Sequence, residues 1–411
     1  MKKIVLIFVC CLTIFHHVRG QAVADTIYAE PVIKDSATFI QASLMIGEPS
    51  HLQAQSVFGH AFLRMQCPSE NLDYCYSMES GNYENFLDIC LGNYPNRLAC
   101  VPTDEYLSIF EKEGRIVTEY PLNLRLEESQ SLWQLLDATA AQGISPYHDF
   151  FHHGCSQEIV SLLTSKLQGK LVYGSRAESY GRTILVLGNQ SLPSNSWMHL
   201  PPTMLGTTDF SDRILSLEEK TLIPWIVPDL FSDATIVGDD GISRPILKDV
   251  TPIEHHPKVH FSENTAPPIV VWFLAMLCVV VVICLVRVCW SVKPVVWLTH
   301  LIDLLLFLLY NAIAFTMLFF SLRSSLPSIS GWNWNFLFYN PVPLLLWLYH
   351  LCHPSVSHIY YKYIGYTVWA VLFMMGMAIV GDHLILEQYL LVSTFAVRCL
   401  FKGLEIRYKS K

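Results

Sequence analysis

Long apolar runs dominate the C-terminal third of the chain. The first extends from Ile269 to Val286, and four further candidates follow at residues 295–322, 336–352, 364–380 and 384–401. An α-helix rises 1.5 Å per residue, so runs of this length can cross a hydrocarbon core of about 30 Å. The pattern therefore predicts a bundle of about five transmembrane helices, of which the third is interrupted by Pro341 and Pro343.

The two ends of the chain predict how this bundle is oriented. Lys2 and Lys3 precede the apolar run 4–15, as in a secretory signal peptide that ends near residue 20. Basic residues collect in the loop after the first run, in the loop before the fourth and in the C-terminal tail. Because Lys and Arg favour the cytoplasmic side, we expect an exported N-terminal domain and a cytoplasmic C-terminus.

The region between the signal and the first apolar run has mixed α and β character. Alternation or β-branched content predicts strands at residues 56–65, 74–78, 115–124 and 183–187, and apolar residues at helical spacing predict helices at 127–141 and 156–167. The expected organisation is a signal peptide (1–20), an α+β exported domain (21–237), a linker (238–268), all-α transmembrane helices (269–403) and a basic tail (404–411). This is an α+β fold followed by an all-α bundle.

Composition narrows the function classes. Of the 411 residues 52% are hydrophobic, and the formal net charge is −8. Binding to nucleic acid requires a surplus of Lys and Arg on one face, and 27 basic residues against 35 acidic ones do not provide it. We therefore expect a membrane-embedded protein with no nucleic-acid partner.

The exported cysteines suggest both disulfides and a free thiol. Five cysteines lie in the exported half, which faces an oxidising compartment. Cys67 and Cys75 flank a turn-rich link, and Cys90 and Cys100 close a short loop, so two local disulfides would leave Cys155 unpaired. A different pairing that includes Cys155 remains an alternative.

Cys155 has the surroundings that a nucleophile needs. It stands at the start of a predicted helix, where the helix dipole favours a thiolate and free backbone N–H groups can hold an oxyanion. His60, at the entry of a predicted strand, is the candidate base. Ser77 and Glu79 share one face of the neighbouring strand and are candidates to orient His60, with His153 or His152 as further alternatives. A zinc site at His148, His152 and His153 lacks a convincing third ligand spacing, so no metal is expected.

Two sequence blocks carry a family resemblance. Residues 56–64 (SVFGHAFLR), and residues 147–151 (YHDFF) running into Gly154-Cys155-Ser156, resemble the periplasmic domain of the Lnb-type bacterial lipoprotein N-acyltransferases. The resemblance implies a circularly permuted papain-like fold, similar to lecithin:retinol acyltransferase-like enzymes, in which the histidine strand precedes the cysteine helix. One departure is His153-Gly154, where the family pattern has an Asp-Asn pair, and it puts a role for an Asn side chain there in doubt.

The resemblance also implies an activity. It predicts a cofactor-independent acyltransferase of the bacterial inner membrane, in which Cys155 and His60 form a thioester and pass its acyl chain to the α-amine of a diacylglyceryl lipoprotein. The acyl donor is a membrane phospholipid or the lipoprotein's own glycerol ester. Candidates that line the substrate are Tyr147, Arg64, Asn335, Asn340 and Glu387. Polar residues within spans otherwise serve as contacts between helices.

Two other functions fit the residues less completely. A membrane-anchored papain-like hydrolase, either a cell-wall amidase or peptidase or a lipase, would use the same Cys–His pair. A non-enzymatic exported binding domain would use Cys155 structurally.

Overall fold

The computed structural model describes most of the chain after residue 40. The described residues are 41–50, 56–80, 91–92, 96–143, 154–239, 241–257, 266–290, 292–345, 348, 356–380 and 384–409. The predicted signal peptide, Cys90, and the candidates Tyr147, His148, His152 and His153 lie outside them. Two compact units are present: a sheet unit, Met1–Ala177 with Thr221–Phe261, and a helical unit, Glu178–Lys220 with Ser262–Lys411.

The sheet unit is built on an antiparallel sheet of six strands in the order β4-β3-β2-β1-β5-β9. The strands are β1 (Gln41–Gly47), β2 (His60–Cys67), β3 (Leu72–Ser80), β4 (Asn96–Pro102), β5 (Val117–Pro121) and β9 (Ile253–His255). The central strands are buried almost throughout, since Leu44, Phe62 and Leu63 have no exposed side-chain surface. Burial on both faces explains why these strands lack a polar side and read as apolar runs.

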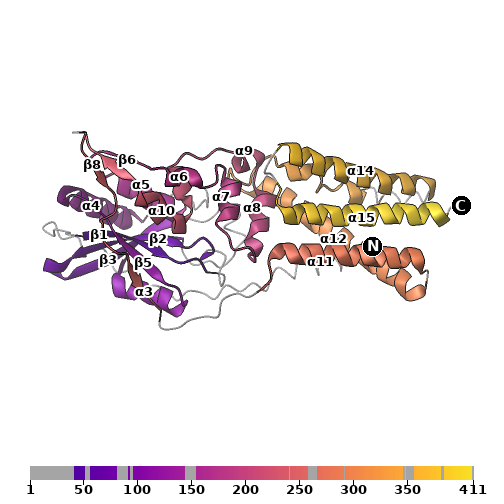
Figure 1. Ribbon diagram of the computed structural model, residues 1–411, viewed down its shortest axis with the longest axis horizontal. Helices are drawn as coiled ribbons and strands as arrows, with labels where there is room; N and C mark the ends of the chain where they lie inside the picture. The colour runs from indigo at the N-terminus through magenta and orange to yellow at the C-terminus, as the bar shows by residue number, and fades with distance from the viewer. Residues whose placement is uncertain are drawn as a thin grey trace. The chain divides into compact units, whose positions relative to one another are not determined.

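Helices cover the two faces of this sheet. On one face, α3 (Thr103–Lys112) packs Tyr106 and Phe110 against Met45 and Phe62. The other face is covered by α4 (Leu126–Gln142) and α5 (Cys155–Thr164), as Figure 1 shows. Tyr76, which points to that second face, donates a hydrogen bond of 2.5 Å to Asp137 of α4. Side chains alternate between the two faces along a strand. Because Tyr76 faces α4, the odd-numbered residues of β3 face α3.

A second, smaller sheet joins β6 (Lys170–Val172), β7 (Thr235–Val237) and β8 (Ser243–Pro245). Glu128 of α4 links this second sheet to α4 through Arg244 of β8. The Glu128 carboxylate, 1% exposed, accepts hydrogen bonds from the guanidinium of Arg244 and from the backbone N–H groups of Arg125 and Gln168. The unit also holds η3 (Pro68–Glu70), α6 (Arg176–Ser179, the last two residues of which belong to the helical unit), η6 (Pro224–Ile226) and α10 (Val227–Ser232).

The helical unit combines C-terminal helices with the earlier segment Glu178–Lys220. The long helices are α11 (Ile269–Cys289), α12 (Lys293–Arg323), α14 (Val356–Val380) and α15 (Leu386–Lys409). This earlier segment contributes α7 (Ile184–Gln190), η4 (Trp197–His199), α8 (Leu200–Leu205) and α9 (Thr208–Ser211). The chain thus leaves the sheet unit after Ala177 and returns at Thr221.

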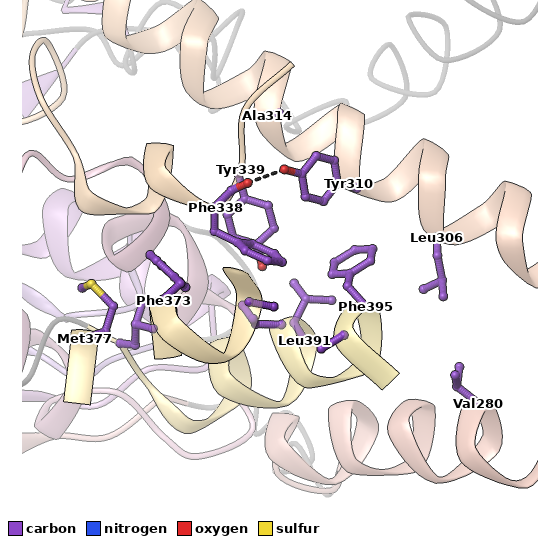
Figure 2. Close-up of a cluster of buried hydrophobic side chains, with 14 of the residues drawn as sticks. Val280, Leu306, Tyr310, Ala314, Phe338, Tyr339, Phe373, Met377, Leu391 and Phe395 are labelled. Carbon is purple, nitrogen blue, oxygen red and sulfur yellow. Dashed lines mark hydrogen bonds between the residues drawn. The ribbon is translucent and has the colours of Figure 1, made fainter. Parts of the chain in front are cut away.

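An aromatic cluster forms the core of the helical unit. Tyr310 of α12 donates its hydroxyl to the carbonyl of Phe338, and Tyr339 packs beside both rings (Figure 2). Phe373 of α14 and Phe395 of α15 complete the contacts around Phe338. Among the described residues, three helices are long and apolar enough to cross a membrane: α11, α12 and Ile359–Ile379 of α14. The predicted span 336–352 begins with the short helix η7 (Trp334–Leu337) and lies partly outside the described residues.

Charged side chains gather between α12 and α15. Asp303 receives two hydrogen bonds from Arg398, at 2.5 and 3.1 Å, and one of 2.8 Å from Lys402. Glu405 lies 3.4 Å from the guanidinium of Arg398, which is 4% exposed. The ion pairs lower the cost of burying these charges in an apolar helix bundle, and they fix how the two helices align.

Two expectations from the sequence are wrong. Residues 183–187 do not form a strand: Thr183 accepts a hydrogen bond from Val186 N–H and caps helix α7, so the apolar run 184–187 is helical. Cys67 and Cys75 do not form the expected disulfide with each other. The register of β2 and β3 pairs Cys67 with Leu72 and Cys75 with Arg64, which places the two cysteines three ladder positions apart. At about 3.4 Å per residue that separation exceeds the Cα distance of a disulfide. Cys100 is a buried free thiol.

Candidate active site

Cys155 is the first residue of α5. The preceding Gly154 has extended backbone angles, φ −74° and ψ 159°, and its carbonyl accepts the first helical hydrogen bond from Glu158 N–H at 3.1 Å. Ser156, Ile159, Val160 and Leu163 are the buried residues of the helix, at the spacing of one helical face. Burial of that face fixes where the helix begins, so the thiol stands at the positive end of the helix dipole.

His60 is held at the first position of β2 by the turn before it. Gly59 has φ +79°, and a Cβ at this residue would lie 2.7 Å from the carbonyl oxygen of Gly47. Only glycine fits such a position without strain. The His60 side chain is 19% exposed and stacks on Phe62, which keeps the imidazole near the end of the strand.

Ser77 is the direct partner of the imidazole. The Nε2 atom of His60 lies 2.7 Å from Ser77 Oγ and 3.7 Å from Glu79 Oε1. Phe62 pairs with Ser77 in the β2–β3 ladder, so the residues at positions 60, 77 and 79 face the same side of the sheet. Of the two residues expected to orient His60, Ser77 makes the hydrogen bond and Glu79 is a more distant electrostatic neighbour.

The thiol and the imidazole interact electrostatically. Burial raises the pKa of Cys155, but the positive charge and hydrogen bond of His60, with a hydrogen bond from the backbone of Ala61, outweigh it and hold this pKa below its ordinary value. Burial lowers the pKa of His60, while the attraction and hydrogen bonding of Cys155 and the charge of Glu79 raise it overall. Opposite shifts favour a thiolate beside an imidazolium, the form in which a cysteine attacks a carbonyl.

Tyr106 completes the site and is absent from the candidates that the sequence indicates. Its hydroxyl lies 2.8 Å from Ser77 Oγ and 2.5 Å from Glu79 Oε1, and the residue is 5% exposed. Tyr106 belongs to α3, which follows Pro102 and carries Asp104 and Glu105 in its first turn. Those residues are a helix-start signal, and Tyr106 and Phe110 have the i, i+4 spacing of a buried face. A helix prediction at 103–112 would have pointed to Tyr106.

Comparisons with protein families match both halves of the chain. The model of the Lnb N-terminal periplasmic domain matches residues 41–194, and the model of the Lnb transmembrane domain matches residues 260–411. The chain belongs to the Lnb family. Searches of the curated proteins and of the solved structures found no match. Lnb membership indicates a lipoprotein-modifying membrane protein with an N-terminal periplasmic domain.

The other candidate residues of this Lnb chain have different surroundings. The guanidinium of Arg64 is bound by two carboxylates, with bonds of 2.9 and 2.5 Å to Asp73 and 2.6 Å to Glu119. Glu119 is also 3.1 Å from Nε2 of His255 in β9. These contacts join four strands of the sheet, so Arg64 has a structural role in this network.

Of the polar candidates in the Lnb transmembrane part, Asn335 lies in η7, Asn340 follows that helix and Glu387 lies in α15. Asn340 donates to the carbonyls of residues 336–338 and so holds its own loop. Asn335 donates to the carbonyl of Thr203 at 2.8 Å and lines a hollow of about 10 Å³, the size of one water molecule, with Thr203, Thr208 and Trp334. Glu387 is the second residue of α15 and is partly exposed. Among the described residues, no group of three His, Cys, Asp or Glu side chains is arranged to hold a metal.

Proposed function

We propose that the chain is a lipoprotein N-acyltransferase. It transfers an acyl chain from a glycerolipid ester to the α-amine of the N-terminal diacylglyceryl-cysteine of a lipoprotein, through a thioester on Cys155. The observation that carries this proposal is the paired Cys155 and His60, with opposite pKa shifts, in a membrane protein of a lipoprotein-modifying family.

The first half-reaction forms the thioester. The Cys155 thiolate attacks the ester carbonyl, so that an S–C bond forms and the C–O bond to glycerol breaks. His60, which holds the proton taken from the thiol, returns it to the departing alkoxide. The products are an acyl-cysteine and a lipid that has lost one acyl chain.

The second half-reaction forms the amide. The neutral α-amine of the lipoprotein attacks the thioester carbonyl, so that an N–C bond forms and the S–C bond breaks. The amine loses a proton to His60, and Cys155 leaves as a thiolate that the imidazolium stabilises. The same imidazole thus acts once as an acid and once as a base in each cycle.

Both steps pass through a tetrahedral oxyanion. The first N–H groups of α5 have no partner within the helix, and they point toward the end at which Cys155 stands. Backbone N–H groups in this arrangement stabilise an oxyanion without needing the Asn that the family pattern has before the cysteine. This supports retention of activity despite His153-Gly154.

The helical unit supplies access to lipid. Both substrates are anchored in the bilayer, and the segment Glu178–Lys220 of the exported half folds as part of the helical unit. The chain therefore passes between the two units three times, after residues 177, 220 and 261. We propose that this tether keeps the exported domain at the membrane that holds both substrates, that Asn335, Asn340 and Glu387 contribute to contacts with lipid head groups, and that the basic tail is cytoplasmic.

The exported domain is, in this proposal, a permuted papain-like fold. The support is the order of the parts: the His60 strand β2 precedes the Cys155 helix α5 in the chain, and α5 packs against β2 and β3. In such folds the cysteine at a helix start faces a histidine on a central strand.

Mass spectrometry of a lipoprotein N-terminus tests the function. Full-length protein in phospholipid vesicles is mixed with a diacylglyceryl lipoprotein that has a free α-amine. The wild-type chain should add one acyl group to the amine, and Cys155→Ala should add none. Cys278→Ala, which removes an exposed thiol from α11, is the matched control and should retain activity. Full N-acylation by Cys155→Ala would contradict the proposal, and release of fatty acid without N-acylation would indicate a hydrolase.

A further inference from the structure

A row of hydrogen-bonding groups leads from His60 away from Cys155. It passes from His60 Nε2 to Ser77 Oγ at 2.7 Å, from Ser77 to the Tyr106 hydroxyl at 2.8 Å, and from Tyr106 to Glu79 Oε1 at 2.5 Å. Ser77 is 1% exposed and Tyr106 is 5% exposed, so water has little access to the two middle members. The protein groups themselves, rather than water, therefore determine which member of each hydrogen bond donates.

The number of available hydrogens fixes the direction of donation. A phenol has one hydrogen, and an ionised carboxylate can only accept. If Tyr106 donated to Ser77, two oxygens 2.5 Å apart, at Tyr106 and Glu79, would face each other with no hydrogen between them. The charge-assisted bond to Glu79 is the stronger of the two, so the phenol donates there. Burial and the neighbouring charge of Glu79 raise the pKa of Tyr106 well above its ordinary value, which keeps the phenol protonated.

The direction of donation in the Tyr106–Glu79 bond also fixes which nitrogen of His60 carries the hydrogen. With its hydrogen directed to Glu79, the Tyr106 oxygen is free to accept, and the Ser77 hydroxyl donates to it. Ser77 Oγ then accepts from Nε2–H of His60. The hydrogen of the neutral imidazole is held on Nε2, and Nδ1 is left as the basic nitrogen.

We propose that Tyr106, directed by Glu79, is a positioning residue that selects the His60 tautomer able to take the proton of Cys155. This inference rests on the proposed Cys–His chemistry and adds to it a role for Tyr106 and Glu79, which act through Ser77. Without Tyr106 the Ser77 hydroxyl has no acceptor on its far side. It can then donate to Nε2, which places the imidazole hydrogen on Nδ1 and removes the base.

Several charged groups act on the Cys155–His60 pair. His60 is influenced by Cys155 of α5, by Glu79 of β3 and by Arg115 after α3, and Arg115 lowers its pKa. Glu79 acts on both partners, because its charge raises the pKa of His60 and also that of Cys155. A variant that only removes the charge of Glu79 therefore mixes two effects, and the test must separate charge from hydrogen bonding.

The first test compares two buried tyrosines of similar chemistry. Tyr106→Phe removes the link between Ser77 and Glu79. Tyr76→Phe removes a tyrosine–carboxylate bond of the same length, to Asp137, from the opposite face of β3. The rate at which iodoacetamide alkylates Cys155 is measured against pH in the full-length protein, by mass spectrometry of the peptide that contains Cys155.

The two tyrosine variants should differ in this assay. In Tyr106→Phe the midpoint for alkylation should rise by about 1 pH unit relative to Tyr76→Phe, the size expected for a lost hydrogen bond to a charged group. Acyl transfer should fall by about 10- to 100-fold. Equal midpoints in the two variants would overturn the inference. Alkylation needs no lipid, so this outcome is independent of whether the acyltransferase proposal holds.

A second pair of variants avoids a cavity in the core. Glu79, whose side chain is 31% exposed, is replaced by Gln or by Ala. Both changes remove the charge, but only Glu79→Gln keeps an oxygen that accepts from Tyr106. The alkylation midpoint should therefore be higher in Glu79→Ala than in Glu79→Gln. Identical midpoints in this pair would show that the acceptor for Tyr106 has no influence on Cys155 and would also overturn the inference.

Discussion

Replacement of Asn333 by Asp should release the segment 200–208 from the rest of the helical unit. The amide of Asn333 donates to the carbonyls of Met204, at 2.8 Å, and Gly206, at 2.5 Å, at the end of α8. The backbone N–H groups of Thr207 and Thr208 donate to the carbonyls of residues 328 and 332 at 2.9 Å each. Aspartate has the same shape as asparagine but replaces the donor by a negatively charged acceptor.

The magnitude follows from the two lost bonds. Asn333 is 5% exposed, so water does not readily replace it. Each bond contributes about 0.5–1.5 kcal/mol net, and the loss of two is therefore worth about 1–3 kcal/mol before any repulsion between carboxylate and carbonyl oxygens. A tenfold change in an equilibrium corresponds to about 1.4 kcal/mol, so local opening should become about 5- to 140-fold more frequent.

Hydrogen exchange in the full-length protein measures this opening. Amide exchange at Thr207 and Thr208 should accelerate by that factor in Asn333→Asp, while exchange in β2 of the sheet unit should not change. Asn340→Asp is the matched control, because the Asn340 amide donates only to carbonyls of its own loop. Unchanged exchange at Thr207 and Thr208 in Asn333→Asp, or equal acceleration in the control, would refute the reasoning.

Three further predictions concern stability and pH. Glu128→Ala should lower the free energy of unfolding of the sheet unit by about 3–5 kcal/mol, measured by denaturation, because it leaves the Arg244 guanidinium half-buried without its carboxylate. Asp303→Asn should lower the thermal stability of the helical unit in detergent, because Arg398 loses its charged partner and one of the two oxygens to which it donates. Since the pKa of Cys155 is held below its ordinary value, its alkylation should continue at a pH where an exposed thiol no longer reacts, and should decline only as the pH falls through that lowered value.

The parts of the fold that were predictable have local signals. The helix at 127–141 and the helix at 156–167 carry apolar residues at helical spacing, and the structure has α4 and α5 there with ends shifted by one to three residues. The strand near 115–124 is also present, as β5. Local patterns also predicted the positions of two candidate site residues. The structure has His60 at the start of β2 and Cys155 at the start of α5.

What escaped prediction depends on contacts distant in the chain. Residues 183–187 have strand-like composition, yet the cap at Thr183 makes them helical. The disulfide expected from the spacing of Cys67 and Cys75 is excluded by the register of β2 and β3, which a sequence does not reveal. Tyr106 lies 29 residues from its partner Ser77, and only the packing of α3 on the sheet unites them. The assignment of 178–220 to the helical unit likewise depends on hydrogen bonds to residues more than a hundred positions away.

A trapped thioester tests the central claim most directly. The full-length protein is incubated in phospholipid vesicles with a diacylglyceryl lipoprotein whose α-amine is acetylated, which supplies both donor esters but no acceptor. After digestion at acidic pH, the peptide that contains Cys155 should carry one acyl group, removable by hydroxylamine, and His60→Ala should abolish it. An unmodified Cys155 in a wild-type sample that N-acylates the free lipoprotein would contradict the account.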